Sequence, residues 1–264
     1  MLDINGVYKV FLPGTVNEKI VLRNVCLKLD EGDFATLIGS NGAGKSTLLN
    51  CIAGVHSPDK GIIKINGVDV TKAIEYKRAY LLGRVFQDPM MGTVSNMSIG
   101  ENIAFAVRRG QKRTLKQCIT NTERDKYREL LKILNLGLED RLNTSAGLLS
   151  GGQRQALTFL MATVKKPKLL LLDEHTAALD PATAEKILNL SHEIIKENNL
   201  TTLMVTHNMR DAIKHGNRLI MMHEGRIVLD IKGQEKQRLT VDNLLKRFGK
   251  ASGAEFESDR ALLY

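Results

Sequence analysis

The sequence has no uninterrupted apolar segment of about 18 residues, the length that a helix needs to cross a bilayer, so we expect no membrane-spanning segment. Cysteine is scarce. Cys26, Cys51 and Cys118 lie far apart and form no C-x-x-C pair, which argues against a disulfide framework or a zinc site. The first residues contain no basic segment followed by an apolar one, so we expect no signal peptide. The reducing cytoplasm is then the expected compartment.

The sequence also lacks internal repeats and low-complexity tracts, and its composition is that of a globular protein. Of its 264 residues, 43% are apolar and 25% are charged, which excludes wholesale disorder. The net charge is +9, and residues 107–132 alone hold nine basic residues against three acids. This segment lacks the series of aromatic residues that would stack nucleic-acid bases. We therefore interpret it as a solvated helical face and expect no nucleic-acid partner.

Short apolar runs alternate with helical patterns along most of the chain. Such runs are typical of strands covered on both faces, and the helices between them indicate a parallel sheet. Asn66-Gly67 separates two further strand patterns and favours a type I′ hairpin turn, and Glu224-Gly225 marks a second hairpin that closes the sheet. The apolar runs are residues 34–38, 81–86, 169–172, 201–205 and 218–222.

Helical patterns occupy the intervals between the strand patterns. An apolar stripe at helical spacing runs from Tyr127 to Leu138, which predicts one helix over this stretch. Residues 88–150 show helical texture without strands, so we expect a helical insertion between two core strands. The other predicted helices cover residues 183–196, 208–214 and 241–248, the last followed by a polar tail.

The clearest motif is a glycine-rich loop between an apolar run and a helical pattern. Its sequence, GSNGAGKS, fits G-x-x-x-x-G-K-[ST], in which the glycines let backbone N–H groups approach a phosphate closely. Lys45 supplies positive charge for the outer phosphates, and the Ser46 hydroxyl is placed to ligate Mg²⁺. The alternative, a glycine-rich turn with a surface lysine, explains neither Ser46 nor the strand–loop–helix order. The predicted cradle comprises Gly39, Ser40, Asn41, Gly42, Ala43, Gly44, Lys45, Ser46 and Thr47.

Two acids, Asp173 and Glu174, follow the apolar run at residues 169–172. An acid at the carboxyl end of a strand lies at the edge of an open α/β sheet where ligands bind. Asp173 can complete the Mg²⁺ shell opposite Ser46, and Glu174 can polarise a water molecule for in-line attack on a phosphate. The alternative is two solvated acids that cap a strand, and the cradle upstream makes it the weaker one.

A second anion-binding helix end is predicted at residues 149–153, LSGGQ, where a serine N-cap and two glycines leave backbone N–H groups reachable. One nucleotide needs only one cradle within a subunit. The second helix end is therefore surplus unless it serves a nucleotide held by another copy of the chain, which predicts a nucleotide sandwiched between two chains. The alternative is an ordinary capped helix.

In order along the chain, the motifs are GSNGAGKST, Gln87, LSGGQ, LLLLDE, Ala178-Leu179-Asp180 and His207. This series resembles the ATP-binding-cassette (ABC) family over residues 2–230. The resemblance implies an α/β fold, with a P-loop NTPase (RecA-like) core built on a parallel sheet, an antiparallel β subdomain, and an inserted helical subdomain at about residues 88–165. We expect the ABC ATPase domain to cover residues 1–232, and a C-terminal helix and polar tail to cover residues 233–264.

The resemblance also assigns roles to residues. Glu174 resembles the catalytic base, and His207 resembles the switch histidine that touches the γ-phosphate. Gln87 ends its predicted strand and resembles the Q-loop residue that contacts Mg²⁺ and water. Asp180 resembles the D-loop aspartate that crosses to the partner subunit. Three residues are thus expected at Mg²⁺: Ser46, Gln87 and Asp173.

The chain departs from the family pattern after the base, where His175 stands in place of the usual proline, and we assign His175 no catalytic role. The aromatic residue that stacks on adenine is expected upstream of the cradle, after the first strand. Phe11 is our choice and Tyr8 is the alternative. The signature residues that the resemblance places on the γ-phosphate bound by the other subunit are Ser150, Gly151, Gly152 and Gln153.

The resemblance implies an ATPase subunit that binds ATP and Mg²⁺, pairs with a second copy of itself and docks on transmembrane permease subunits at the cytoplasmic face of the membrane. Residues 88–101, with Met90 and Met91, are expected to form the groove for a permease helix. The phrases QDPMMGT and DEHTAALDP resemble bacterial importers that work with an extracellular substrate-binding protein, for amino acids such as tryptophan or tyrosine. The alternatives are a soluble non-transport ABC ATPase and a P-loop small-molecule kinase, which would not need the LSGGQ helix.

Overall fold

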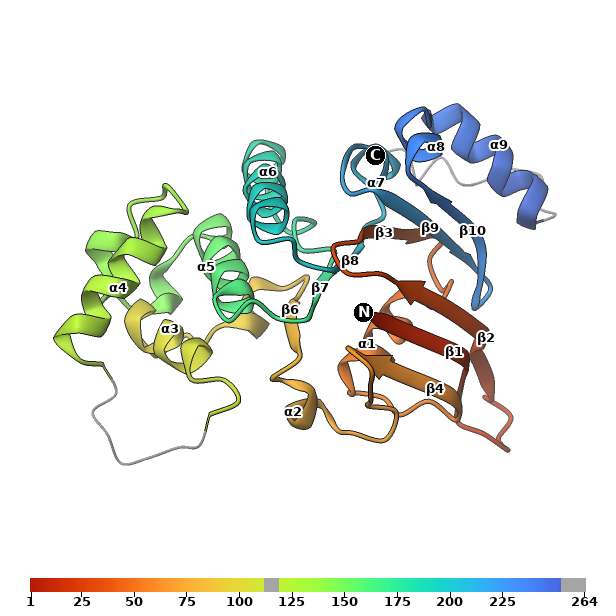
Figure 1. Ribbon diagram of the computed structural model, residues 1–264, viewed down its shortest axis with the longest axis horizontal. Coiled ribbons are helices and arrows are strands. Elements are labelled where there is room, and N and C mark those ends of the chain that lie inside the picture. Colours follow the sequence, from red (N-terminus) through yellow and green to blue (C-terminus); the bar gives the residue numbers. More distant parts are fainter. Residues whose placement is uncertain (112–118, 253–264) are drawn as a thin grey trace.

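The computed structural model describes residues 1–111 and 119–252 and contains two sheets flanked by helices (Figure 1). The larger sheet has the strand order β10-β9-β3-β8-β7-β6, and its strands run parallel except for β10 at one edge. The five apolar runs predicted as core strands all lie in it, and their ends differ from the prediction by at most one residue. The strands are β3 (Phe34–Gly39), β6 (Leu82–Val85), β7 (Leu169–Asp173), β8 (Thr202–Val205), β9 (Arg218–His223) and β10 (Arg226–Lys232).

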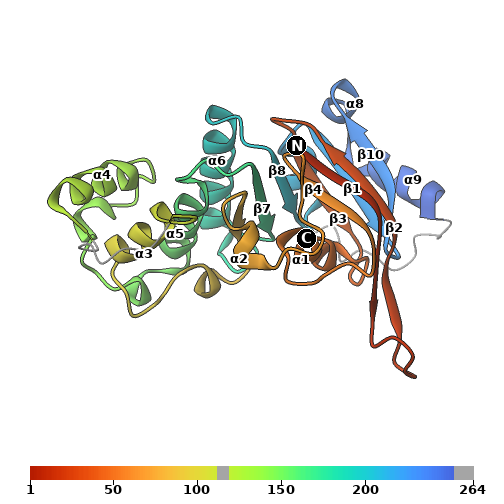
Figure 2. The same cartoon turned by 60° about the horizontal axis from the view of Figure 1, so that its bottom comes forward.

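A smaller antiparallel sheet, with the order β2-β1-β4-β5, shares one apolar core with the larger sheet. That core joins Ile4 of β1, Leu49 of α1 and Leu171 of β7. Asn66 and Gly67 have φ angles of 51° and 78°, as a type I′ turn requires, so the predicted hairpin is confirmed. Figure 2 shows the β1–β2 hairpin extending beyond both sheets. The elements here are β1 (Leu2–Phe11), β2 (Lys19–Leu29), β4 (Lys60–Ile65), β5 (Val68–Asp69), α1 (Lys45–Ala53) and α2 (Glu75–Arg78).

Between β6 and β7, the described residues form helices and no strand, as predicted, and they lie to one side of the sheets in Figure 1. The prediction of one helix reaching Leu138 is wrong in its extent, because the helix ends at Lys132. Asn135 and Gly137 adopt positive φ angles of 51° and 65°, which stop a right-handed helix. Leu138 stays fully buried in the apolar cluster of this region. The helices are η1 (Pro89–Gly92), α3 (Ile99–Val107), α4 (Asn121–Lys132), η2 (Glu139–Arg141), η3 (Ala146–Leu148) and α5 (Gly151–Thr163).

The basic segment carries exposed ion pairs where the structure describes it. Arg128 and Lys132 pair with acids one turn away on α4, at 2.9 and 2.6 Å, in keeping with the predicted solvated face.

Cys26 is exposed and Cys51 is buried, and both are free thiols. Among the described residues, no helix combines the length and apolarity that spanning a membrane requires. Three of the nine basic residues (Lys112, Arg113 and Lys116), Cys118 and the polar tail beyond Ser252 lie outside the described ranges.

Helices after β7, β8 and β10 complete the fold, and the three predicted at residues 183–196, 208–214 and 241–248 all form. α5 and α6 cover one face of the larger sheet, where Phe159, Leu172 and Met204 are buried together. The last helix continues to Ser252, four residues beyond the prediction. Lys236, which is buried, donates from Nζ to the carbonyls of His215 and Gly216 and so ties the C-terminal segment to the end of α7. These helices are α6 (Pro181–Glu197), α7 (Met209–Lys214), α8 (Gln234–Gln237) and α9 (Val241–Ser252).

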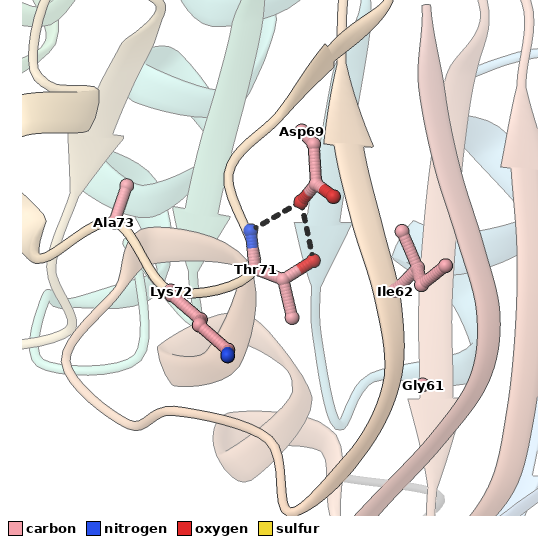
Figure 3. Close-up of a pocket in the computed structure, with 6 residues that line it drawn as sticks. All are labelled: Gly61, Ile62, Asp69, Thr71, Lys72 and Ala73. Carbon is pink, nitrogen blue, oxygen red and sulfur yellow. Dashed lines mark hydrogen bonds between the residues drawn. The ribbon is translucent and has the colours of Figure 1, made fainter.

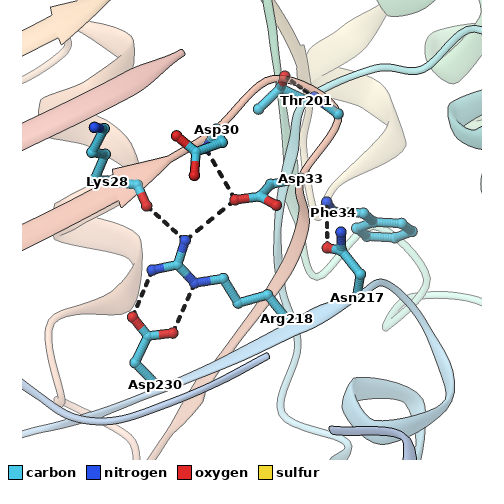
Figure 4. A network of polar contacts seen from close by, with 9 residues as sticks. Lys28, Asp30, Asp33, Phe34, Thr201, Asn217, Arg218 and Asp230 are labelled. Atoms are coloured by element: carbon cyan, nitrogen blue, oxygen red, sulfur yellow. Dashed lines mark hydrogen bonds and ion pairs between the residues drawn. The ribbon is translucent and has the colours of Figure 1, made fainter. Parts of the chain in front are cut away.

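A buried arginine links the two sheets (Figure 4). Arg218, at the start of β9, donates from Nε and Nη2 to both carboxylate oxygens of Asp230 at 2.7 and 2.6 Å. Its Nη1 donates to the Lys28 carbonyl at 2.6 Å and to Asp33 Oδ2 at 3.3 Å. Only 8% of the Arg218 side chain is exposed, so this bidentate pair and its carbonyl contact fix the end of β2 against β9 and β10.

We expect Arg218→Met to lower the free energy of unfolding by about 2 kcal/mol, because it removes the buried guanidinium that now binds two carboxylates and a carbonyl. Urea unfolding followed by circular dichroism measures this change. Arg128→Met, which removes an exposed pair on α4, is the control and should change stability by less than about 0.5 kcal/mol. Equal stabilities of the two variants would contradict the role assigned to Arg218.

Candidate functional site

The glycine-rich loop joins the buried strand β3 to α1, as the motif requires. Gly39 ends β3 with φ 151°, and a Cβ there would lie 2.2 Å from the Met222 carbonyl oxygen. Gly44, the N-cap residue before α1, has φ 98°, and a Cβ there would lie 2.9 Å from the Val21 carbonyl oxygen. No side chain caps the helix, so its first N–H groups are free to bind an anion. The strand–loop–helix context is therefore confirmed.

Lys45 is buried within this loop. Its Nζ donates to the carbonyls of Gly39 at 2.6 Å and Ser40 at 3.1 Å. Burial lowers the pKa of the Lys45 ammonium, and the carboxylates of Glu174 and Asp173 act in the opposite direction. The lysine thus places a poorly solvated positive charge at the loop. Of the other cradle residues, Ala43 and Gly44 are buried, Ser40 and Thr47 are half-buried, and Asn41, Gly42 and Ser46 are exposed.

Asp173 and Glu174 follow each other at the carboxyl end of β7, next to β8. Burial raises the pKa of the Asp173 carboxyl, and the neighbouring Arg84 guanidinium opposes that rise. Glu174 has left-handed backbone, with φ 43°, and its N–H donates to the Val205 carbonyl at 3.0 Å. The extended backbone of β7 thus ends at Asp173, and the chain changes direction at Glu174.

The structure brings His207 to Glu174. The imidazole Nδ1 lies 3.4 Å from Glu174 Oε2, although the two residues are 33 positions apart in the sequence. Their neighbouring strands β7 and β8 are parallel, so both chains emerge at the same sheet edge. Asn208 then caps α7 by accepting from the N–H groups of Arg210 and Asp211, which fixes the backbone beside His207.

Gln87 does not end its strand as predicted, because β6 stops at Val85 and Gln87 follows it in an exposed segment. The backbone departs from the sheet at Phe86, whose carbonyl accepts a hydrogen bond from Gln155 Nε2 at 3.1 Å. Gln155 lies on α5, one turn into the LSGGQ helix. Sequence reasoning missed this anchor, and the only available signal was its position in the run GGQRQ.

LSGGQ forms a helix start with a capping box. Ser150 Oγ accepts from the Gln153 N–H at 3.3 Å, and Gln153 Oε1 accepts from the Ser150 N–H at 3.2 Å. Gly152 packs so closely that a Cβ would lie 2.3 Å from Thr183 Cγ2 on α6, whereas Ser150 and Gly151 are exposed. The predicted N-cap is confirmed. In Figures 1 and 2, β7 separates α5 from α1.

Asp180, Phe11 and His175 are placed as follows. Asp180 caps α6, its Oδ1 accepting from the Thr183 N–H at 3.1 Å. Hydrogen bonding to the side chain of Thr183, and then to its N–H, lowers the pKa of Asp180. Phe11 is the last residue of β1, half-buried, with its ring edge-on to His56 at 5.3 Å. His175 is buried, with Nε2 3.4 Å from Ser191 Oγ, and burial lowers the pKa of His175 to about 4, so its imidazole is neutral near pH 7.

The residues at this edge fit a magnesium ion bound together with phosphate. The Ser46 hydroxyl is exposed at the head of α1, and Asp173 offers a carboxylate at the end of β7. Oxygen ligands are those that Mg²⁺ prefers, and it usually takes one or two from protein and the rest from phosphate and water. In the part of the chain that the structure describes, no three His, Cys, Asp or Glu side chains gather into a metal cage.

The hollow drawn in Figure 3 is a different place. It lies on the smaller sheet and its adjoining loop, and it is lined by none of the residues that the motifs single out. Asp69 there accepts from the Thr71 N–H at 2.9 Å and the Thr71 hydroxyl at 2.6 Å, so its carboxylate is already engaged. The lining residues are Gly61, Ile62, Asp69, Thr71, Lys72 and Ala73.

Comparison with known proteins agrees with this geometry. Residues 22–177 match the family model described as ABC transporter. The chain is 42% identical over 248 residues to a tyrosine transport ATP-binding protein of Clostridioides difficile, covering 94% of this chain and 98% of that one. It is 37% identical to a methionine import ATP-binding protein of Photobacterium profundum, over 81% of this chain and 60% of that protein.

Solved structures show the same fold. An ATP-binding cassette of an ABC transporter in its ADP conformation, MJ1267, superposes with a TM-score of 0.76 at 26% identity, over 94% of this chain and 98% of that one. A dimeric post-hydrolysis state of the cassette MJ0796, bound to ADP and Pi, gives a TM-score of 0.74 at 29% identity, over 88% and 98% of the two chains. With the glycine-rich loop, the LSGGQ helix and the paired acids in this order along the sequence, the chain belongs to the ABC transporter family and is one of its ATP-hydrolysing cassettes.

Proposed function

We propose that this cassette powers an importer for an amino acid of the tyrosine class. The observation that carries the proposal is the 42% identity that extends over almost the whole of the tyrosine transport protein. The methionine import relative also handles an amino acid, which supports the same substrate class. Family membership sets aside the kinase alternative, and the transport names of these relatives disfavour the soluble non-transport ATPase.

We infer roles in hydrolysis from the geometry. Glu174 accepts a proton from water as the water oxygen attacks the γ-phosphorus, the bond to the bridging oxygen breaks, and ADP leaves with the electron pair. His207, whose Nδ1 lies 3.4 Å from Glu174 Oε2, would hold the γ-phosphate and the attacking water in line. Lys45 moves from its carbonyl contacts to the outer phosphates. Ser46, Asp173 and Gln87 would hold Mg²⁺, which when bound neutralises phosphate charge.

Adenine and the second subunit complete the proposed site. Phe11 stacks on adenine, with Tyr8 as the alternative. The exposed Ser150 and Gly151, together with Gly152 and Gln153, clamp the nucleotide of a second copy, and Asp180 reaches across to that copy. The separation of α5 from α1 within one chain supports this arrangement, because neither helix end alone surrounds a triphosphate. ATP then favours the closed pair since it contacts both chains only there.

The partners follow from the same proposal. Transmembrane permease subunits would dock on residues 88–101, where Met90, Met91 and Val94 are each more than half exposed although they are apolar. The cassette would then work at the cytoplasmic face of the membrane, and an extracellular substrate-binding protein would deliver the amino acid. We also propose the division into an ATPase domain at 1–232, with its helical subdomain at about 88–165, and a C-terminal segment at 233–264.

We expect Glu174→Gln to bind ATP normally, to accumulate the closed dimer and to lower turnover at least about 10²-fold, because the water loses its proton acceptor. Phosphate release and size-exclusion chromatography with ATP measure the two effects. Glu185→Gln, on the exposed face of α6, is the matched control and should behave as the parent. Turnover by Glu174→Gln at the parent rate would contradict the assignment of the base.

We expect Ser150→Arg to prevent the ATP-dependent dimer while the monomer keeps its nucleotide affinity, because the added cation and bulk fill the helix end that faces the second copy. Sedimentation and nucleotide titration measure the two properties. Asn121→Arg puts the same side chain at the exposed head of α4 and should leave dimerisation intact. Loss of affinity in the Ser150→Arg monomer would instead place the signature at the chain's own nucleotide.

We expect deletion of the gene for this chain to abolish uptake of radiolabelled tyrosine, and the parent gene to restore it. The Glu174→Gln gene should fail to restore it, because the permease would have no hydrolysis cycle to drive it. Uptake of labelled lysine, a cationic amino acid, serves as the control. Unchanged tyrosine uptake in the deletion strain would overturn the substrate class and leave the ATPase assignment standing.

A further inference from the structure

A second cation, Arg84, reaches the carboxylate that ends β7. Arg84 lies on β6 and pairs in register with Leu171, two residues before Asp173, so both side chains point to the same face of the sheet. Its Nη2 lies 3.5 Å from Asp173 Oδ2, and the two side chains are only 13% and 15% exposed. None of the sequence motifs contains Arg84.

Arg84 is also held by α1, the helix that follows the glycine-rich loop. Its Nη2 donates to Asn50 Oδ1 at 2.8 Å. Asn50 lies on α1, the helix whose first turn carries Lys45 and Ser46, and its carbonyl accepts from the N–H groups of three following residues, which fixes its backbone. The amide of Asn50 therefore sets where the guanidinium sits relative to Asp173.

Arg84 also touches the segment that leads to Gln87. Its guanidinium carbon lies 4.6 Å from the centre of the Phe86 ring, a cation–π distance. The Phe86 carbonyl is in turn held by Gln155 of the signature helix. One side chain thus contacts groups on α1, on β7 and at the exit of β6.

Arg84 differs from the arginines that only brace the fold. Arg78, fully buried, donates to four backbone carbonyls, and Arg218 donates to two carboxylates and a carbonyl. In the described residues, Arg84 Nε is buried without a hydrogen-bond partner. Its bonds instead converge through Nη2 on Asn50 and Asp173. The Arg84 guanidinium thus binds the Asp173 carboxylate although burial leaves its own Nε–H without a hydrogen bond, which costs free energy.

We propose that Arg84 is a positioning residue for magnesium binding: Nη2 holds Oδ2 of Asp173 and leaves the other carboxylate oxygen for the ion and its water. The proposal rests on the role proposed above for Asp173. A guanidinium has no acceptor and does not itself ligate a metal, so Arg84 acts only through the carboxylate. Groups that orient a metal ligand typically change metal affinity 10–100-fold when removed.

The test is the ratio of the Kd for AMP-PNP, a non-hydrolysable ATP analogue, in EDTA to its Kd in excess Mg²⁺, measured by calorimetry. For Arg84→Met we expect this ratio to fall about tenfold, with the Kd in EDTA unchanged, because only the metal-dependent part of binding is lost. Arg109→Met is the matched control. Arg109 also donates one Nη2 bond, to the Ala162 carbonyl at 3.2 Å, but it has no contact with Asp173, so the parent ratio should remain.

Asn50→Ala frees Arg84 without removing its charge, and we expect a smaller fall in the same ratio. If Arg84→Met does not fold, the ratio of the Asn50→Ala variant tests the proposal in its place. A parent ratio in a folded Arg84→Met variant, or in Asn50→Ala where that variant alone folds, overturns the proposal. Asp173→Asn distinguishes failure of the role proposed for Asp173 from failure of the role proposed for Arg84. If Asp173→Asn keeps the parent ratio, the role of Asp173 in binding magnesium is wrong. If Asp173→Asn lowers the ratio and the Arg84 and Asn50 variants do not, only the role of Arg84 is wrong.

Discussion

The site depends on a balance of buried charge at one edge of the larger sheet. Lys45 sits in the loop after β3, and Asp173 and Glu174 sit at the end of β7, with β8 between the two strands. Burial disfavours the charged form both of Lys45 and of Asp173, and each favours the charge on the other. Because parallel strands end at the same edge, the sheet alone brings these groups together.

Local backbone then distributes the side chains. Asp173 is the last residue of β7, whereas Glu174 follows the strand in left-handed conformation and its carboxylate lies 3.4 Å from His207 Nδ1. Such backbone costs free energy and persists where the surroundings hold it, here through the hydrogen bond to the Val205 carbonyl. The residue after this turn is His175, which is buried with Nε2 3.4 Å from Ser191 Oγ.

The sequence pattern predicted the elements well where a local signal fixes the backbone. Asn66-Gly67 requires positive φ at both positions, and the tight turn follows. The Ser150 capping box is equally local. The pattern failed at the end of α4, since Leu134 and Leu138 continue the helical spacing but reach the same core through a turn. It also failed at Gln87, because the apolar run continues past the last residue that hydrogen bonds keep in the sheet.

By itself, the sequence determined the order of motifs, the glycine positions of the cradle and the alternation of strands and helices, because each depends on a few neighbouring residues. Only the tertiary structure decided that His207 lies beside Glu174 and that Gln155 anchors the segment before Gln87. It also decided that Arg84, which donates to Asn50, contacts Asp173. These contacts join residues far apart in the chain. They depend on the order in which distant strands assemble into the sheet, and the residues next to each contact do not specify that order.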